Sequence, residues 1–224
     1  MSLALGKTAG GQEGTSVIGK SPILAAMLLG FMSGAAVAGC ERAYVSGSST
    51  LMPVRGGFDE ALLDRAILAE ANYQRCLKDR APLKPLRQLR GPAQRHSVWM
   101  AQAETLSHRS SVAGRRSLQD RISSTGLPVR SAAENLAQIP LYDLTPRFRV
   151  IDAASCRFTS PDGRYLGRHS YASFAHKVVG LWMQSPGHRR NLLSRSTSYM
   201  AAAAVLDPGT HYCGDIYVTQ IFAG

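Results

Sequence analysis

Two histidines and one acidic residue of this sequence stand where a side chain could do chemistry. His188 follows a Ser-Pro-Gly turn at 185–187, in which proline starts a new helix and glycine lets the backbone turn sharply. His108 comes at the predicted exit of a helix, where a side chain can reach into a cleft. Glu134 and Asn135 lie among small apolar residues, an expensive setting unless both are hydrogen-bonded or used. Taken as an isolated pair, Glu-Asn favours an ordinary polar turn.

Helical and strand-like spacing predicts the elements that must position these side chains. We expect helices over 59–80, 91–106 and 170–184, a short helix after a capping box at Ser117, a hairpin over 157–166, and two antiparallel strands over 199–206 and 215–222. Asp59 is the expected cap of the first helix. His96 lies in the apolar stripe of the second helix, so we interpret it as a core histidine.

Several motifs, taken in order, resemble those of the bacterial CAP (SCP-like) domain. They are Asn72 and Arg75 of the first helix, Leu106-Ser107-His108, Ser117-Leu118-Gln119-Asp120-Arg121 with Gly126, Ala133-Glu134-Asn135-Leu136-Ala137, Trp182-Met183-Gln184-Ser185-Pro186-Gly187-His188 with the Arg-Arg-Asn-Leu-Leu that follows, and the closing segment 217–222. The resemblance covers roughly residues 58–223. It implies an α+β fold, a three-layer α-β-α sandwich with a small antiparallel sheet and a shallow cleft at one end.

The resemblance also implies which residues line that cleft. In the family, two histidines and acidic residues surround it, and it can hold a divalent metal such as zinc. Carried over by motif, the histidines are His108 and His188, which are the candidate metal ligands, and the carboxylate is Glu134, followed by Asn135. Ser185 stands where the fuller eukaryotic pattern has a second glutamate.

The chemistry of this set leaves three interpretations open. Two neutral imidazoles can bind zinc and leave positions for water or substrate. Glu134 could then orient an imidazole or act as general base in a metal-dependent hydrolase of envelope peptide or ester bonds. It could instead be a charge-paired staple that pins the loops and needs no metal. No serine or cysteine stands in a recognisable nucleophile context, which disfavours acyl transfer.

The N-terminal segment reads as an export signal over residues 1–39. Lysines precede a short apolar core, and small residues lead to Val37-Ala38-Gly39-Cys40, which resembles a bacterial lipobox. We therefore expect Cys40 to be lipidated and to anchor the protein in the envelope membrane. Ordinary cleavage near Ala38 is the alternative.

The rest of the chain is predicted to be one domain. Residues 40–57, rich in Ser and Gly, read as a flexible tether, and 58–224 as the CAP domain with an insertion around 138–169. In an oxidising compartment we favour a Cys156–Cys213 disulfide, with Cys76 a buried thiol on its helix.

The charge balance is strongly basic. The formal net charge of the 224 residues is +11, carried mostly by scattered arginines without a run that resembles a nucleic-acid arm. A diffuse basic surface suits anionic envelope polymers or lipid headgroups. We expect a monomeric, exported binding module, not an enzyme, whose ligand is a lipid, a peptide or another envelope component, and no specific nucleic-acid partner.

Overall fold

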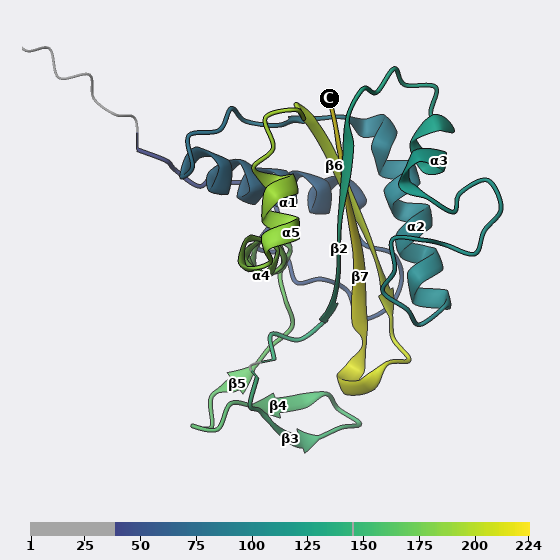
Figure 1. Ribbon diagram of the computed structural model, residues 1–224. Coiled ribbons are helices and arrows are strands. Elements are labelled where there is room, and N and C mark those ends of the chain that lie inside the picture. The colour runs from purple at the N-terminus through teal and green to yellow at the C-terminus, as the bar shows by residue number, and fades with distance from the viewer. Residues whose placement is uncertain (1–38, 145) are drawn as a thin grey trace, which may run out of the picture. The chain divides into compact units, whose positions relative to one another are not determined.

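A four-stranded sheet separates two layers of helices (Figure 1). The computed structural model describes residues 39–144 and 146–224, so the predicted export signal lies outside the described residues except for Gly39. The sheet contains β1 (Lys84–Pro85), β6 (Tyr199–Asp207), β7 (Asp215–Ala223) and β2 (Ala132–Pro140), in that order. One layer holds α1 (Glu60–Cys76), α4 (Tyr171–Gln184) and α5 (Pro186–Leu192); the other holds α2 (Arg90–Gln102) and α3 (Leu118–Ser123). The predicted α+β sandwich is confirmed.

Strand register decides which layer each sheet residue faces. β7 pairs antiparallel with both β2 and β6, whereas the short β1 runs parallel to β6. Because side chains alternate across a strand, Ala202 and Ala204 join the core under α1 and α4, while Ala201 and Ala203 join the core under α2. The alanine run of β6 keeps both layers close to the sheet.

Local capping explains several helix starts. The Asp59 carboxylate accepts the Leu62 N–H at the start of α1. Ser117 and Asp120 form a reciprocal capping box at α3, and Ser170 caps α4 through the Ser173 N–H. These caps satisfy backbone donors that a helix leaves unpaired at its first turn, so each start is fixed by residues within a few positions.

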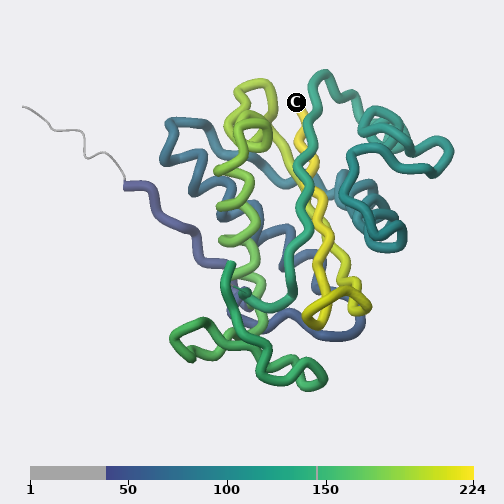
Figure 2. The backbone as a smooth tube through the Cα atoms, turned by 60° about the horizontal axis from the view of Figure 1, so that its bottom comes forward, coloured from purple at the N-terminus to yellow at the C-terminus, as the bar shows by residue number. Residues whose placement is uncertain are grey.

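The insertion forms a small sheet of its own. Its strands are β3 (Arg149–Asp152), β4 (Arg157–Thr159) and β5 (Tyr165–Leu166), which include the predicted hairpin. They lie at the end of the main sheet away from the C-terminus (Figures 1 and 2). The predicted Cys156–Cys213 disulfide ties this sheet to η2 (His211–Cys213), next to β7.

Three segments end or fold differently from the sequence-based expectation. α2 ends at Gln102, so His108 lies in the loop between α2 and α3 and not at a helix exit. The first helix likewise ends at Cys76 instead of near residue 80. Glu134 and Asn135 lie inside β2, not in a polar turn, because nine consecutive residue pairs of β2 and β7 stay in register.

The segment that precedes α1 corrects two predictions. Residues 40–57, expected to be a flexible tether, pack on the domain: Met52 is fully buried and its N–H donates to the His169 carbonyl. Cys40 forms a disulfide with Cys76. One sulfur cannot hold both a disulfide and a thioether, so the structure contradicts lipidation of Cys40 as well as the free buried thiol at Cys76.

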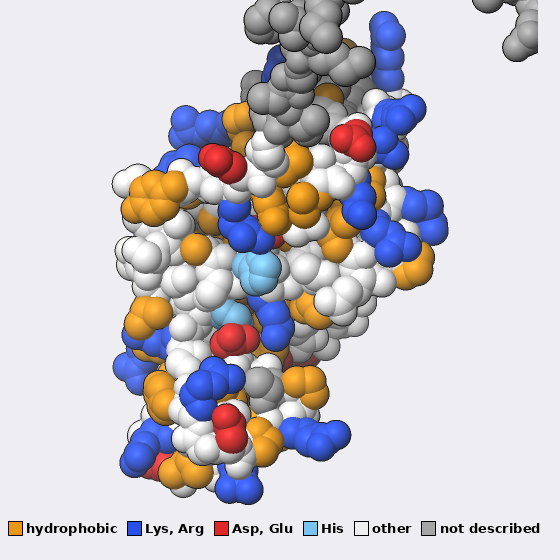
Figure 3. All heavy atoms as spheres, turned by 90° about the vertical axis from the view of Figure 1, so that its left-hand side faces the viewer, with side chains coloured by type: hydrophobic (Ala, Val, Ile, Leu, Met, Phe, Trp, Pro, Cys, Tyr) orange, Lys and Arg blue, Asp and Glu red, His pale blue; other side chains and the backbone are white. Residues whose placement is uncertain are grey.

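The described surface agrees with a basic exported protein. Figure 3 shows Lys and Arg side chains spread over the whole visible face instead of gathered into one patch. All four cysteines are disulfide-bonded, which is typical of proteins from oxidising compartments. In residues 39–144 and 146–224, no helix is both long and apolar enough to cross a membrane.

Candidate functional site

Glu134 and Asn135 are consecutive residues of β2, so their side chains lie on opposite faces of the sheet. Glu134 pairs with Ile221 of β7, a member of the core beneath α2 and α3. Asn135 pairs with Gln220, whose amide contacts Met200 on the α1–α4 side. The two polar residues that are adjacent in sequence therefore belong to separate sites.

Glu134 is the centre of a buried charge cluster, which we call the Glu134 cluster (Glu134, Arg121, His108 and His96). Glu134 is 5% exposed. Both of its carboxylate oxygens accept a hydrogen bond. Arg121 Nη2 donates to Oε2 at 2.6 Å, and His108 Nδ1 donates to Oε1 at 2.9 Å. Arg121 is itself only 2% exposed, so this is a desolvated, charge-assisted pair.

Arg121 also organises the loop that carries His108. Its guanidinium donates to the His108 carbonyl at 3.3–3.4 Å and to the carbonyls of Arg115 and Arg116 at 3.4 and 3.5 Å. One side chain of α3 thus holds the loop backbone and the β2 carboxylate together. This arrangement corresponds to the staple interpretation, with arginine as the cation that sequence reasoning did not assign.

His96 adds a neutral imidazole to the cluster. Its Nε2–H donates to the Ser107 carbonyl at 2.9 Å, which fixes the tautomer because a carbonyl only accepts. Burial lowers the pKa of His96, an effect that the Glu134 charge partly opposes. Its Nε2 lies 3.9 Å from Glu134 Oε1. Since the ring is neutral at pH 7, that approach is a packing contact and not an ion pair; His96 is a core residue, as the sequence suggested.

His108 and His188 face the same region from different elements. His108 has an exposed side chain, while His188, in α5, is half-buried. Burial lowers the pKa of His188, and the charge of His108 lowers it further. Among the described residues, Glu134 contacts His108 but not the His188 ring, so it does not bridge the two histidines.

Asn135 and Ser185 position α5. Asn135 is fully buried; its Nδ2 donates to the His188 carbonyl at 3.3 Å, and its Oδ1 accepts from Asn191 Nδ2 at 2.9 Å. Ser185 joins α4 to α5: its N–H bonds Leu181 and Trp182 carbonyls, and its carbonyl accepts the Arg189 N–H. Both residues therefore fix the position of α5 and of His188, which α5 carries.

The donor set does not fit a protein-bound zinc centre of three ligands. Among the described residues, no three His, Cys, Asp or Glu side chains converge in a metal-binding arrangement. Glu134, the third candidate, already accepts from Arg121 and His108. Two imidazoles remain, fewer than the three protein ligands usual for catalytic zinc.

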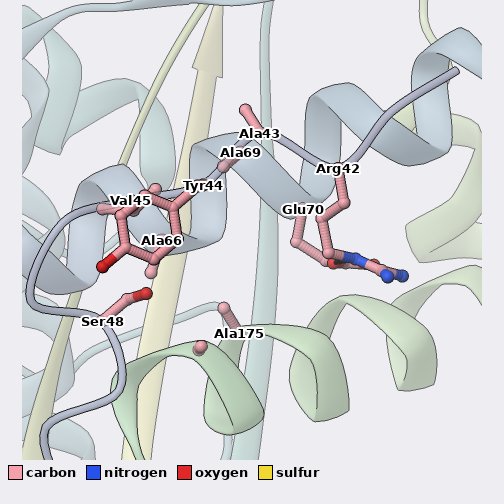
Figure 4. A pocket seen from close by; sticks show the side chains of 10 residues that line it. Arg42, Ala43, Tyr44, Val45, Ser48, Ala66, Ala69, Glu70 and Ala175 are labelled. Carbon is pink, nitrogen blue, oxygen red and sulfur yellow. Dashed lines mark hydrogen bonds and ion pairs between the residues drawn. The ribbon is translucent and has the colours of Figure 1, made fainter.

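A separate hollow lies between the N-terminal segment, α1 and α4 (Figure 4). We call it the α1–α4 hollow; its volume is about 220 Å³ and its lining includes Arg42, Val45, Ala66, Ala69, Glu70 and Ala175. Arg42 pairs with the buried Glu70 at one end and lies 4.2 Å over the Tyr73 ring. The Cys40–Cys76 disulfide fixes the start of the segment that forms its roof. Sequence analysis missed this hollow because it interpreted the roof as a tether.

The comparison with protein families identifies the domain. Residues 68–222 match the model of the cysteine-rich secretory protein family, CAP. The chain belongs to the CAP family. Comparison with curated proteins gives no match.

Solved structures resemble this CAP domain at low sequence identity. An outer surface protein from Borrelia burgdorferi is 15% identical, with a TM-score of 0.50 over 75% of this chain and 96% of that one. An extracellular SCP-domain protein from Bacillus anthracis str. Ames is 20% identical (TM-score 0.49; 73% and 41% covered). A cysteine-rich secretory protein from Staphylococcus aureus subsp. aureus Mu50 is 16% identical (TM-score 0.44; 74% and 39% covered). This chain spans less than half of the last two proteins, and likeness at this identity concerns the fold alone.

Proposed function

We propose that this CAP domain is a non-catalytic binding module that takes the acyl part of a lipid in the α1–α4 hollow. The observation that carries the proposal is the small-residue lining of that hollow, in which alanines from both helices leave room instead of filling the space. Apolar walls with few polar groups are typical of ligand sites. Arg42, at one end, keeps 47% of its side chain exposed and can meet an anionic headgroup.

The Glu134 cluster supports binding over hydrolysis. Its buried carboxylate pairs with Arg121 and accepts from His108, which is the contact pattern of a structural staple. The metal-dependent hydrolase that the sequence also suggested, with His108, His188 and Glu134, would use the His108–Glu134 bond to orient an imidazole ligand, but would have only two imidazoles to hold the metal. It stays a prediction.

Binding of a fluorescent fatty acid tests the proposal. We expect saturable binding by the full chain, and a loss of affinity of about tenfold in Ala69→Phe, because the new ring would occupy the hollow. Ala113→Phe is the matched control, since Ala113 lies on the exposed loop of the Glu134 cluster. Equal affinity in Ala69→Phe and the parent, or a loss confined to Ala113→Phe, would contradict the proposal.

A further inference from the structure

A second hollow lies where the exit of α1 meets the loop between α5 and β6. We call it the arginine hollow; its volume is about 280 Å³, and its lining includes Arg75, Arg80, Arg195, Thr197 and Asp79. It is unrelated to the Glu134 cluster and to the α1–α4 hollow, with which it shares no lining residue. Three guanidinium groups around one small space require an explanation, because like charges repel and the buried Arg75 also loses solvation.

Backbone carbonyls account for part of this arrangement. Arg75 Nε donates to the Ala81 carbonyl at 2.7 Å, and its Nη1 donates to the carbonyls of Leu192 and Ser194 at 2.7 and 3.0 Å. Arg80 Nε donates to the Leu193 carbonyl at 3.1 Å. These bonds hold the end of α5 against the end of α1. Carbonyls are dipoles without net charge, so they satisfy the donors but leave the positive charges uncompensated.

No described carboxylate neutralises these cations. Within residues 39–144 and 146–224, Arg75, Arg80 and Arg195 make no ion pair with an acidic side chain, although Arg75 is 2% exposed. Asp79 lines the same hollow but makes no ion pair either. Burial lowers the pKa of Arg75, and the charge of Arg80 lowers it further. Buried charges in proteins are usually paired, so an uncompensated one indicates a missing anion.

A buried hydroxyl points to the same conclusion. Thr197 lines the hollow and is 4% exposed, yet its Oγ1 makes no hydrogen bond with any described residue. Buried polar side-chain atoms are normally satisfied. A structural role for Arg75 alone would explain the carbonyl contacts, but it would not explain this hydroxyl.

We propose that the arginine hollow binds a phosphate group. Guanidinium forks offer pairs of N–H donors that match the oxygens of phosphate, and a threonine hydroxyl can donate to another oxygen. Arg75 and Arg80 are fixed by their carbonyl contacts, so the site is already formed before the anion arrives. The group can be free phosphate or the headgroup of an anionic phospholipid. This site is independent of the acyl-binding function proposed above.

Titration of the disulfide-bonded full chain with inorganic phosphate tests the inference, with calorimetry as the readout. We expect one saturable site, with a dissociation constant about tenfold higher in Arg195→Gln, because a charge-assisted bond is lost. Arg195 is exposed, and its side chain makes no hydrogen bond or ion pair with a described residue, so the variant should fold. Thr197→Val, which keeps the volume of the side chain, should weaken binding several-fold.

A matched charge control and a second probe complete the experiment. Arg149→Gln removes an exposed arginine of β3, in the separate small sheet, and should bind phosphate like the parent. Vesicles of phosphatidylcholine with and without phosphatidic acid test the headgroup source. Binding of either probe that Arg195→Gln weakens and Arg149→Gln does not supports the site. No saturation by millimolar phosphate together with no Arg195-dependent vesicle binding would overturn it, as would equal losses in both arginine variants.

Discussion

The Glu134 cluster and the arginine hollow treat buried charge in opposite ways. In the cluster, one carboxylate meets a guanidinium at 2.6 Å and an imidazole at 2.9 Å, so charge and hydrogen bonds are satisfied within the chain. In the arginine hollow, a buried guanidinium meets only carbonyls, next to two more arginines and an unpartnered hydroxyl. The first arrangement is complete without a ligand, whereas the second lacks an anion.

The comparison shows that the histidines and glutamate of the family motifs are not the residues of the proposed phosphate site. The histidines and glutamate that stand in the family motifs form a structure that fixes a loop, a helix and a strand. Arg80 and Arg195 attracted no interpretation from sequence, and Arg75 attracted one only as a residue of the family resemblance. Their uncompensated charge is nevertheless the stronger indication of a ligand. Motif residues therefore do not have to be the residues that bind.

Loss of Arg121 should break the cluster with the largest effect. Arg121→Met leaves the Glu134 carboxylate buried without its cation, which costs about 3–5 kcal/mol of unfolding free energy. The double variant Arg121→Met/Glu134→Gln should recover part of that cost, because it removes the unpaired charge. Urea unfolding of the three proteins measures both values. A loss below about 1 kcal/mol in Arg121→Met would show that the pair is not a staple.

Removal of the Cys40–Cys76 disulfide tests the region beside the arginine hollow. This disulfide closes a loop with a sequence separation of 36, next to Arg75. Cys40→Ser/Cys76→Ser should cost about 2–4 kcal/mol, since the unfolded chain regains entropy. Thermal unfolding under non-reducing conditions measures it. Mass spectrometry of the parent provides the check: a diacylglyceryl group on Cys40 would contradict the disulfide altogether.

Acidification should lower the unfolding free energy through His96 of the Glu134 cluster. Burial lowers the folded-state pKa of His96 below its ordinary value of 6.5. Below that value the unfolded chain binds a proton that the folded chain does not, so the unfolding free energy is highest above pH 6.5 and falls as the pH decreases. Urea unfolding between about pH 7.5 and 5 should show this slope, and His96→Gln should reduce it. A slope equal in both proteins would assign the effect to other groups, such as His169 and His188, whose pKa values burial also lowers.

Addition of zinc should change the protein least among these experiments. Because His108 and His188 are the only two candidate ligands and no group of three converges among the described residues, we expect the purified protein to retain no stoichiometric zinc at micromolar free metal. Elemental analysis and calorimetry, with His108→Ala and His188→Ala as comparisons, measure it. One zinc ion per chain, lost in both variants, would restore the metal-centre hypothesis and with it the hydrolase. Glu134→Gln would then separate a catalytic base from a structural carboxylate.

Sequence reasoning predicted the elements whose signals are local. The Asp59 cap, the Ser117 capping box, the helix over 170–184 and the two long C-terminal strands are confirmed within a few residues. Their determinants lie within one turn or one strand, where periodicity and side-chain-to-backbone hydrogen bonds act. The Cys156–Cys213 pairing is also confirmed. The neighbourhood of His108, Glu134 and His188 followed from family resemblance and not from local signals.

Long-range partners were decided by the tertiary structure. Arg121 reaches Glu134 across 13 positions, and one arginine among many carries no local mark of that role. Cys40 was interpreted from the residues before it, but its partner lies 36 positions later. Sequence by itself thus determined the main helices, the two C-terminal strands, the basic charge and the family motifs, but not the strand β2 that carries Glu134. Which charges are neutralised, and which remain open to a ligand, depends on desolvation and on distances between distant segments, and only the packed chain sets those.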